Sequence, residues 1–89
     1  MFEQGDIIIL PIPFTNLTST KKRPAIVISR NEYNSITDDI IVMAITSNIS
    51  MKEYCINLYS KDLISGFLLA DSQIRADKIY TISKTIVIK

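Results

Sequence analysis

The stretch Ile7-Ile8-Ile9-Leu10-Pro11-Ile12-Pro13 gives the first indication of the fold. A short, continuous apolar run of this kind is typical of a β-strand that is covered on both faces. Proline has no backbone N–H to donate to a neighbouring strand, so it commonly ends such a run. We therefore predict a buried strand over 7–10 that terminates at Pro11.

Outward from this stretch, further apolar runs recur at close spacing. The chain holds eighteen Ile, three Val and seven Thr but only four Ala, and β-branched residues favour strands over helices. Six more strands are predicted, over 24–29, 40–46, 54–58, 72–76, 79–82 and 85–88. One helical turn is expected around Glu32-Tyr33-Asn34 and a second over 61–64, closed by Gly66. The result is a mostly β chain, with a small and strongly curved antiparallel sheet or barrel.

The composition limits the possible functions. Eighty-nine residues form a single domain, 1–89, and a net charge of +1 excludes a polybasic protein that holds nucleic acid by bulk charge. The absence of His and the single Cys exclude a disulfide framework, a cysteine–histidine metal site and a histidine-activated nucleophile. No apolar run is long enough to span a membrane, and the acidic, polar start does not resemble a signal peptide. We therefore expect a cytoplasmic protein without a cofactor.

Lys21-Lys22-Arg23 is the densest positive cluster, and it is expected at the end of a polar loop over 14–22. One interpretation is an ordinary solvated run of charges. The other is a phosphate site, in which Arg23 offers a planar fork, the lysines attract an anionic backbone and Pro24 fixes the main chain.

Two further clusters carry hydrogen-bonding or charged side chains. Thr46-Ser47-Asn48 follows the strand over 40–46 and either satisfies a turn or binds a phosphate oxygen. In Arg75-Ala76-Asp77 the charged side chains share one face of a strand, with Gln73 beside them. This pair is either a surface ion pair or a site in which the guanidinium keeps a proton-accepting carboxylate ionised.

Four segments taken in order resemble the PemK/MazF family of toxin–antitoxin endoribonucleases. They are Gly5-Asp6-Ile7-Ile8-Ile9, Lys22-Arg23-Pro24-Ala25-Ile26-Val27-Ile28-Ser29, Ala44-Ile45-Thr46-Ser47 and Arg75-Ala76-Asp77-Lys78-Ile79-Tyr80-Thr81-Ile82. The resemblance implies a small SH3-like barrel, a homodimer, a cognate antitoxin and metal-independent cleavage of single-stranded mRNA. In this family the 2′-hydroxyl attacks the adjacent phosphate and leaves a 2′,3′-cyclic phosphate and a 5′-hydroxyl.

The resemblance also implies roles for individual residues. Arg23, Thr46, Arg75 and Asp77 match active-site positions, and Asp77 and Arg75 match a pair that acts as acid and base. Contacts to RNA are expected from Lys21, Lys22, Ser47, Gln73 and Lys78, and no metal ligand is expected. We expect the Arg23 and Asp77 side chains to be exposed in an RNA groove.

Two features depart from the family pattern. Tyr80 stands where members commonly carry Arg, and the chain ends at Lys89 without the C-terminal helix of many members, which we expect to be absent. Two alternatives to the nuclease therefore stay open: a toxin of the same fold that binds a topoisomerase, as CcdB does, and a non-catalytic SH3-like binding module. The many isoleucines predict more apolar surface than one copy covers, and hence a two-fold homodimer.

Overall fold

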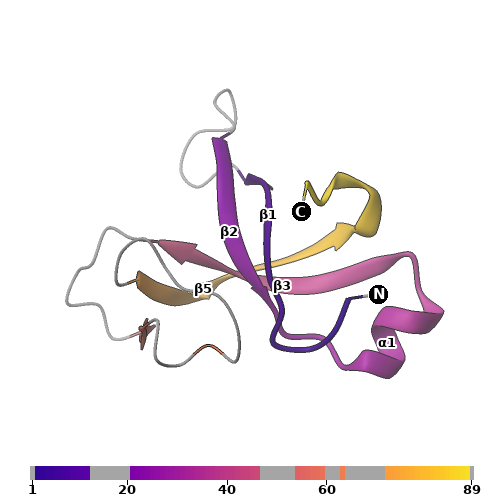
Figure 1. Cartoon of the computed structure of the whole chain (residues 1–89), viewed down its shortest axis with the longest axis horizontal. Helices are drawn as coiled ribbons and strands as arrows, with labels where there is room; N and C mark the ends of the chain where they lie inside the picture. The colour runs from indigo at the N-terminus through magenta and orange to yellow at the C-terminus, as the bar shows by residue number, and fades with distance from the viewer. Residues whose placement is uncertain (1, 13–20, 47–53, 60–62, 64–71, 89) are drawn as a thin grey trace.

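One antiparallel sheet dominates the computed structural model, which describes residues 2–12, 21–46, 54–59, 63 and 72–88. Its strands lie in the order β1-β2-β3-β5-β4. Figure 1 shows this sheet with a single α-helix in the described part of the chain. The mostly β prediction is confirmed. The elements are β1 (Ile7–Ile12), β2 (Lys21–Val27), α1 (Asn31–Ile36), β3 (Asp39–Thr46), β4 (Cys55–Leu58), β5 (Ser72–Ser83) and the 3₁₀ helix η2 (Lys84–Ile86).

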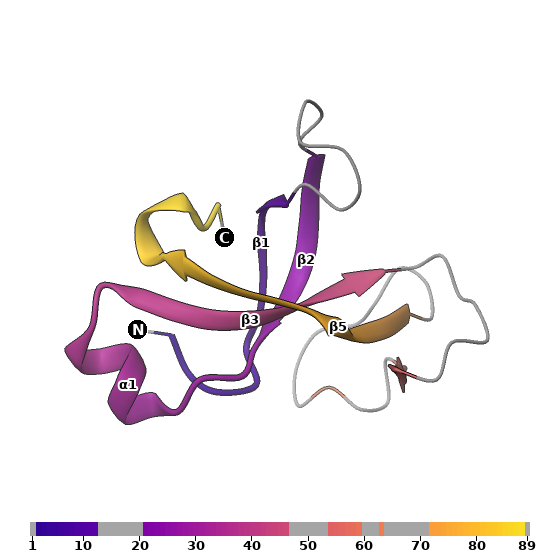
Figure 2. The same cartoon turned by 180° about the vertical axis from the view of Figure 1, so that it is seen from behind.

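The sheet is strongly twisted but open in the described residues, because the outer strands β1 and β4 do not pair with each other. The C-terminal segment lies instead beside β1, as Figures 1 and 2 both show, and the Ile88 N–H donates to the Ile9 carbonyl at 2.8 Å. The predicted strand over 85–88 is wrong. Its first residues form η2, whose start is capped by the Ser83 hydroxyl accepting from the Thr85 N–H.

Strand β1 runs through Pro11 to Ile12, beyond its predicted end. The Ile9 carbonyl points to the outer edge, where it meets Ile88, and residues two apart in a strand point their backbone groups the same way. Pro11 therefore directs its backbone nitrogen to the open edge of the sheet, where the lack of an N–H removes no hydrogen bond to β2. An edge strand tolerates proline at such a position.

The largest differences from the other predicted strand boundaries are in β2 and β5. Strand β2 begins at Lys21 rather than Pro24, because residues 21–23 pair with Leu10, Pro11 and Ile12. The predicted strands over 72–76 and 79–82 are parts of the single strand β5, which has a register shift inside it. The loop over 14–20 and the helical turn over 61–64 with Gly66 lie outside the described residues, apart from Leu63.

Hydrophobic side chains cover both faces of the sheet, which explains the continuous apolar runs. We call the first the core face; its buried cluster comprises Ile8, Leu10, Ala25, Val27, Ile40, Val42 and Ala44. On the opposite, second face, a smaller cluster consists of Ile45, Leu58 and Ile74 with Ile7, Ile26 and Met43 against it. The predicted burial of β1 on both faces is therefore only partly correct, since Ile9 on the second face is 39% exposed.

A buried polar contact holds α1, the predicted helical turn, against the sheet. Asn34 is 1% exposed, and its amide donates to the Ser29 carbonyl at 3.1 Å and to the Phe2 carbonyl at 3.4 Å. The Ser29 hydroxyl donates to the Asn34 side-chain oxygen and accepts from the Ile41 N–H at 3.0 Å. These bonds satisfy polar groups that would otherwise be costly to bury.

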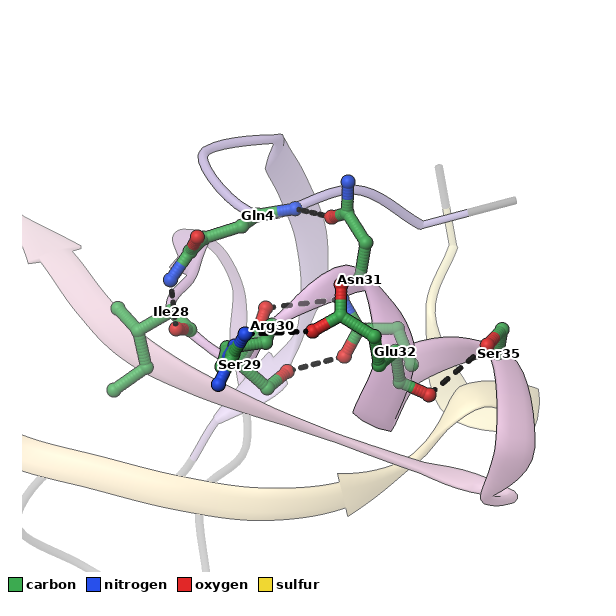
Figure 3. A network of polar contacts seen from close by, with 8 residues as sticks. Gln4, Ile28, Ser29, Arg30, Asn31, Glu32 and Ser35 are labelled. Atoms are coloured by element: carbon green, nitrogen blue, oxygen red, sulfur yellow. Dashed lines mark hydrogen bonds and ion pairs between the residues drawn. The ribbon is translucent and has the colours of Figure 1, made fainter.

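The N-terminal residues are tied to the same region (Figure 3). The Gln4 N–H donates to the Asn31 side-chain oxygen at 2.7 Å, and the Gln4 amide donates to the Ile28 carbonyl at 2.9 Å. Gly5 follows with a φ of +95°, which other residues rarely adopt, and its N–H reaches the Val27 carbonyl at 2.7 Å. This turn brings the chain into register for β1.

Candidate active site

Arg75 and Asp77 form a two-bonded ion pair on β5. The Arg75 Nε donates to Asp77 Oδ1 at 2.9 Å, and Nη2 donates to Oδ2 at 2.8 Å. The two side chains remain 17% and 30% exposed, so the pair lies at the surface without being fully solvated. The predicted juxtaposition of these two side chains is confirmed. Paired bonds of this kind are geometrically specific and stronger than a single contact.

The ion pair shifts both pKa values. The hydrogen bonds from Arg75 lower the pKa of Asp77, and the bonds to Asp77 raise the pKa of Arg75. The carboxylate is therefore ionised at neutral pH and can accept a proton without first losing one. Each of its oxygens accepts one bond from Arg75 and keeps a second lone pair for another donor.

A bulge in β5 explains how this pair is presented. Strand β3 pairs its consecutive residues Met43 and Ala44 with Ile79 and Arg75, so three residues of β5 have no partner in β3. Ala76, the first of them, donates its N–H to the Tyr54 carbonyl at 3.0 Å instead. Bulges of this kind bend a strand and redirect its side chains. As a result Asp77 has no partner in β3, whereas Arg75 remains paired with Ala44.

The core face of the sheet ends in polar side chains near this bulge. Thr46 pairs with Gln73, and Gln73 pairs with Asn57, so these residues form one row across β3, β5 and β4. Residues directly opposite in an antiparallel ladder project to the same face. The Gln73 amide, in a residue only 6% exposed, donates to the Asn57 side-chain oxygen at 3.1 Å.

Arg23 lies on the core face of β2. Ala25 belongs to the buried core cluster, and Arg23, two residues before it in the strand, projects from the same face. Arg23 is half-buried, and its Nε atom is shielded from solvent. The expectation of an exposed Arg23 is therefore wrong: the side chain sits at the end of the core rather than in open solvent.

Pro24 separates β2 from β3 at this point. The Val27 N–H donates to Asp6 and the Ile28 N–H to Ile41, so even-numbered residues here direct their backbone groups toward β3. The backbone nitrogen of Pro24 also points toward β3, but proline has no N–H to donate. The described β2–β3 pairing accordingly stops at Ala25, just before Arg23 and Thr46.

The remaining predicted residues are only partly brought together. Lys22 is exposed and alternates with Arg23, so it projects from the second face, away from Arg23. Lys78 belongs to the β5 bulge and is half-buried. The backbone of Lys21 begins β2. Ser47 lies outside the described residues.

Sequence reasoning did not assign Asn57 or Tyr80 to the site. Asn57 joins the polar row only through the pairing of β4 with β5, and no local pattern predicts that register. Tyr80 faces the core beside Val42, and its nearness to Arg75 depends on the bulge. The sequence does not reveal the bulge, which explains why β5 was predicted as two strands and why Tyr80 was not assigned to the site.

Fold and site together define a class of protein: a small β protein with arginine side chains, a hydroxyl and an ionised carboxylate at one end of its sheet. Such groups suit chemistry at a phosphate, where positioning and charge neutralisation supply most of the catalysis. The family model of the PemK-like, MazF-like toxins of type II toxin–antitoxin systems matches residues 3–89, and the chain belongs to that family. Members are generally endoribonucleases.

Curated proteins gave no match to the chain. In the part of the chain that the structure describes, no helix has the length and apolar character needed to cross a membrane. No group of three or more Cys, Asp or Glu side chains gathers as a metal site in those residues.

Proposed function

We propose that this protein is the toxin of a type II toxin–antitoxin system and cleaves single-stranded mRNA without a metal ion. The 2′-hydroxyl attacks the neighbouring phosphate, leaving a 2′,3′-cyclic phosphate upstream and a 5′-hydroxyl downstream. The observation that carries the proposal is the Arg75–Asp77 pair at the polar end of the core face, in a chain of the PemK/MazF family.

Each group has a role that suits its chemistry. Asp77 accepts the proton of the 2′-hydroxyl through a lone pair that Arg75 leaves open. The guanidinium groups of Arg75 and Arg23 hold the phosphate and offset its developing charge. Thr46 orients a phosphate oxygen with its hydroxyl.

Flanking RNA contacts are assigned to Lys21, Ser47, Gln73 and Lys78. Lys22 projects from the other face, so we assign it long-range attraction of the RNA backbone rather than a contact beside Arg23.

The proposed partners follow from the same reading. A cognate antitoxin accompanies a type II toxin, and we propose that an acidic segment of it folds over the RNA groove and competes with RNA. We also propose a homodimer, supported by the exposed isoleucines of the second face. The proposed location is the cytoplasm, where mRNA is available.

The test is cleavage of a single-stranded RNA by the purified protein in excess EDTA, with chemical identification of both new ends. We expect a cyclic phosphate upstream and no cleavage where the attacking nucleotide is 2′-deoxy. Arg23→Ala and Asp77→Asn should each lower the rate on the order of 10²-fold or more, and Thr46→Ala should lower it less.

Asp38→Asn is the matched control, since it removes the same charge at an exposed position near α1. It should retain the activity of the unmodified protein. Loss of cleavage in EDTA would contradict the metal-independent mechanism. Full activity of both folded variants, Arg23→Ala and Asp77→Asn, would show that the site is assigned wrongly.

A further inference from the structure

The proposed cleavage needs a proton donor, and the resemblance to the family offers only the Arg75–Asp77 pair for this step; this inference rests on the proposed function. When the bond between phosphorus and the 5′-oxygen breaks, that oxygen leaves with an electron pair and must be protonated. Arginine is too weak an acid to supply the proton readily, and Asp77 is ionised by its bond to Arg75. The chain has no His to take this role.

Tyr80 is the neighbouring side chain with a proton to give. It pairs with Val42 on β3, and Arg75 pairs with Ala44 two residues further on, so Tyr80 and Arg75 project from the same face. The β5 bulge removes residues 76–78 from the ladder, and Ile79, which pairs with Met43, projects from the second face. Arg75 and Tyr80 are therefore successive paired side chains along the core face.

Electrostatics and packing agree with this placement. The bond to Asp77 is the main cause of the raised pKa of Arg75, and Cys55 and Tyr80 make smaller contributions. The Tyr80 ring packs against the core cluster and is half-buried. The core therefore fixes the position of the ring.

We propose that the Tyr80 hydroxyl is the general acid of the cleavage and protonates the leaving 5′-oxygen. A phenolic hydroxyl is a donor, and its proton can be transferred to an oxygen within hydrogen-bond reach. As the phosphorus–oxygen bond breaks, its electron pair goes to the 5′-oxygen and the phenol transfers its proton there. The tyrosinate then regains a proton from water, and Asp77 releases to water the proton it took from the 2′-hydroxyl.

The experiment compares two leaving groups on the full chain and on Tyr80→Phe, which keeps the ring and removes only the hydroxyl. One RNA carries the natural 5′-oxygen at the cleaved bond, and the other carries sulfur there. A thiolate leaves without protonation, since thiols titrate near pH 8.5. Tyr80→Phe should lower kcat on the oxygen substrate on the order of 10²-fold with little change in KM. On the sulfur substrate it should cleave at close to the unmodified rate.

Tyr33→Phe is the matched control, because it removes a phenol from α1 and should leave both rates unchanged. Thermal unfolding of each variant verifies that it is folded. Full activity of Tyr80→Phe on the oxygen substrate, or an equal loss on both substrates, would overturn the role of Tyr80 while leaving the nuclease intact. If the unmodified protein cleaves neither RNA, the proposed function fails and the role of Tyr80 fails with it.

Discussion

At the scale of single residues, Asp77 combines two properties that oppose each other. Its bonds to Arg75 fix the carboxylate in place and keep it ionised, but the lowered pKa also makes it a weaker proton acceptor. A base of this kind contributes mainly by position, because it is always in the correct protonation state. The guanidinium that weakens it is also available to neutralise the phosphate as charge develops there.

The direction of this pKa shift predicts the pH dependence of cleavage. A carboxylate whose pKa is lowered in the folded protein stays ionised at pH values where an ordinary aspartic acid, near 3.9, is already half protonated. The acid limb of kcat/KM should therefore lie at lower pH than it would for an aspartate with an ordinary pKa. Arg75→Gln removes the cause of the shift, so the acid limb of its residual activity should move to higher pH.

Arg30→Gln provides the control for that pH profile. Arg30 also pairs with a carboxylate, that of Glu32 at 3.0 Å, but both side chains are largely exposed beside α1. Its profile should superimpose on that of the unmodified protein. An acid limb that stays in place in Arg75→Gln would show that Asp77 is not the group whose ionisation controls cleavage.

At the scale of elements, strand positions were more predictable than strand pairing. The apolar runs of β1, β3 and β4 and the helical turn at α1 follow from local sequence, because burial and β-branching act residue by residue. The β5 bulge does not, since it arises from the match between two distant strands. For the same reason Arg75 and Asp77 could be placed together from sequence, whereas the row through Thr46, Gln73 and Asn57 could not.

The docking of α1 leads to a prediction about stability. Asn34→Ala removes the amide that bonds the Ser29 and Phe2 carbonyls and leaves the buried Ser29 hydroxyl without its acceptor. Leaving such groups unsatisfied costs about 1–3 kcal/mol of unfolding free energy. Urea denaturation should show this loss, while the cleavage rate of the folded fraction should stay unchanged because α1 lies at the other end of β3 from Thr46 (Figure 2).

Ser35→Ala is the matched variant on the same helix. Its hydroxyl donates to the Glu32 carbonyl at an exposed position, so the change should alter the unfolding free energy by no more than about 0.5 kcal/mol. Equal losses in the two variants would mean that the buried Ser29–Asn34 contact contributes nothing beyond an ordinary surface bond.

At the scale of the whole molecule, the two faces of the sheet differ in how completely they are covered. The core face is closed by the N-terminal and C-terminal segments, through Phe2 and Val87. On the second face, Ile7, Ile26, Met43 and Ile79 form one apolar row across four strands, and Ile45, Ile74 and Ile56 form a second row, with Ile9 of β1 on the same face. Ile56 and Ile79 in these rows are 56% and 55% exposed.

This incomplete cover predicts a dimer that uses the second face. Burying a large aliphatic side chain contributes about 1.5–3 kcal/mol, so several exposed isoleucines together favour association with a second copy. Light scattering at micromolar concentration should give about twice the chain mass of 10.1 kDa. Ile56→Asp, combined with Ile9→Asp, should shift the protein toward monomer, because each change sets a charge against the partner's apolar surface.

Ile36→Asp is the control that separates this surface from exposed isoleucine in general. Ile36 on α1 is 81% exposed, more than either changed residue, yet it lies outside the two apolar rows. The dimer should survive this change if the second face is the interface. A dimer that resists Ile9→Asp with Ile56→Asp but dissociates in Ile36→Asp would place the interface at α1, and a monomeric unmodified protein would rule out the dimer.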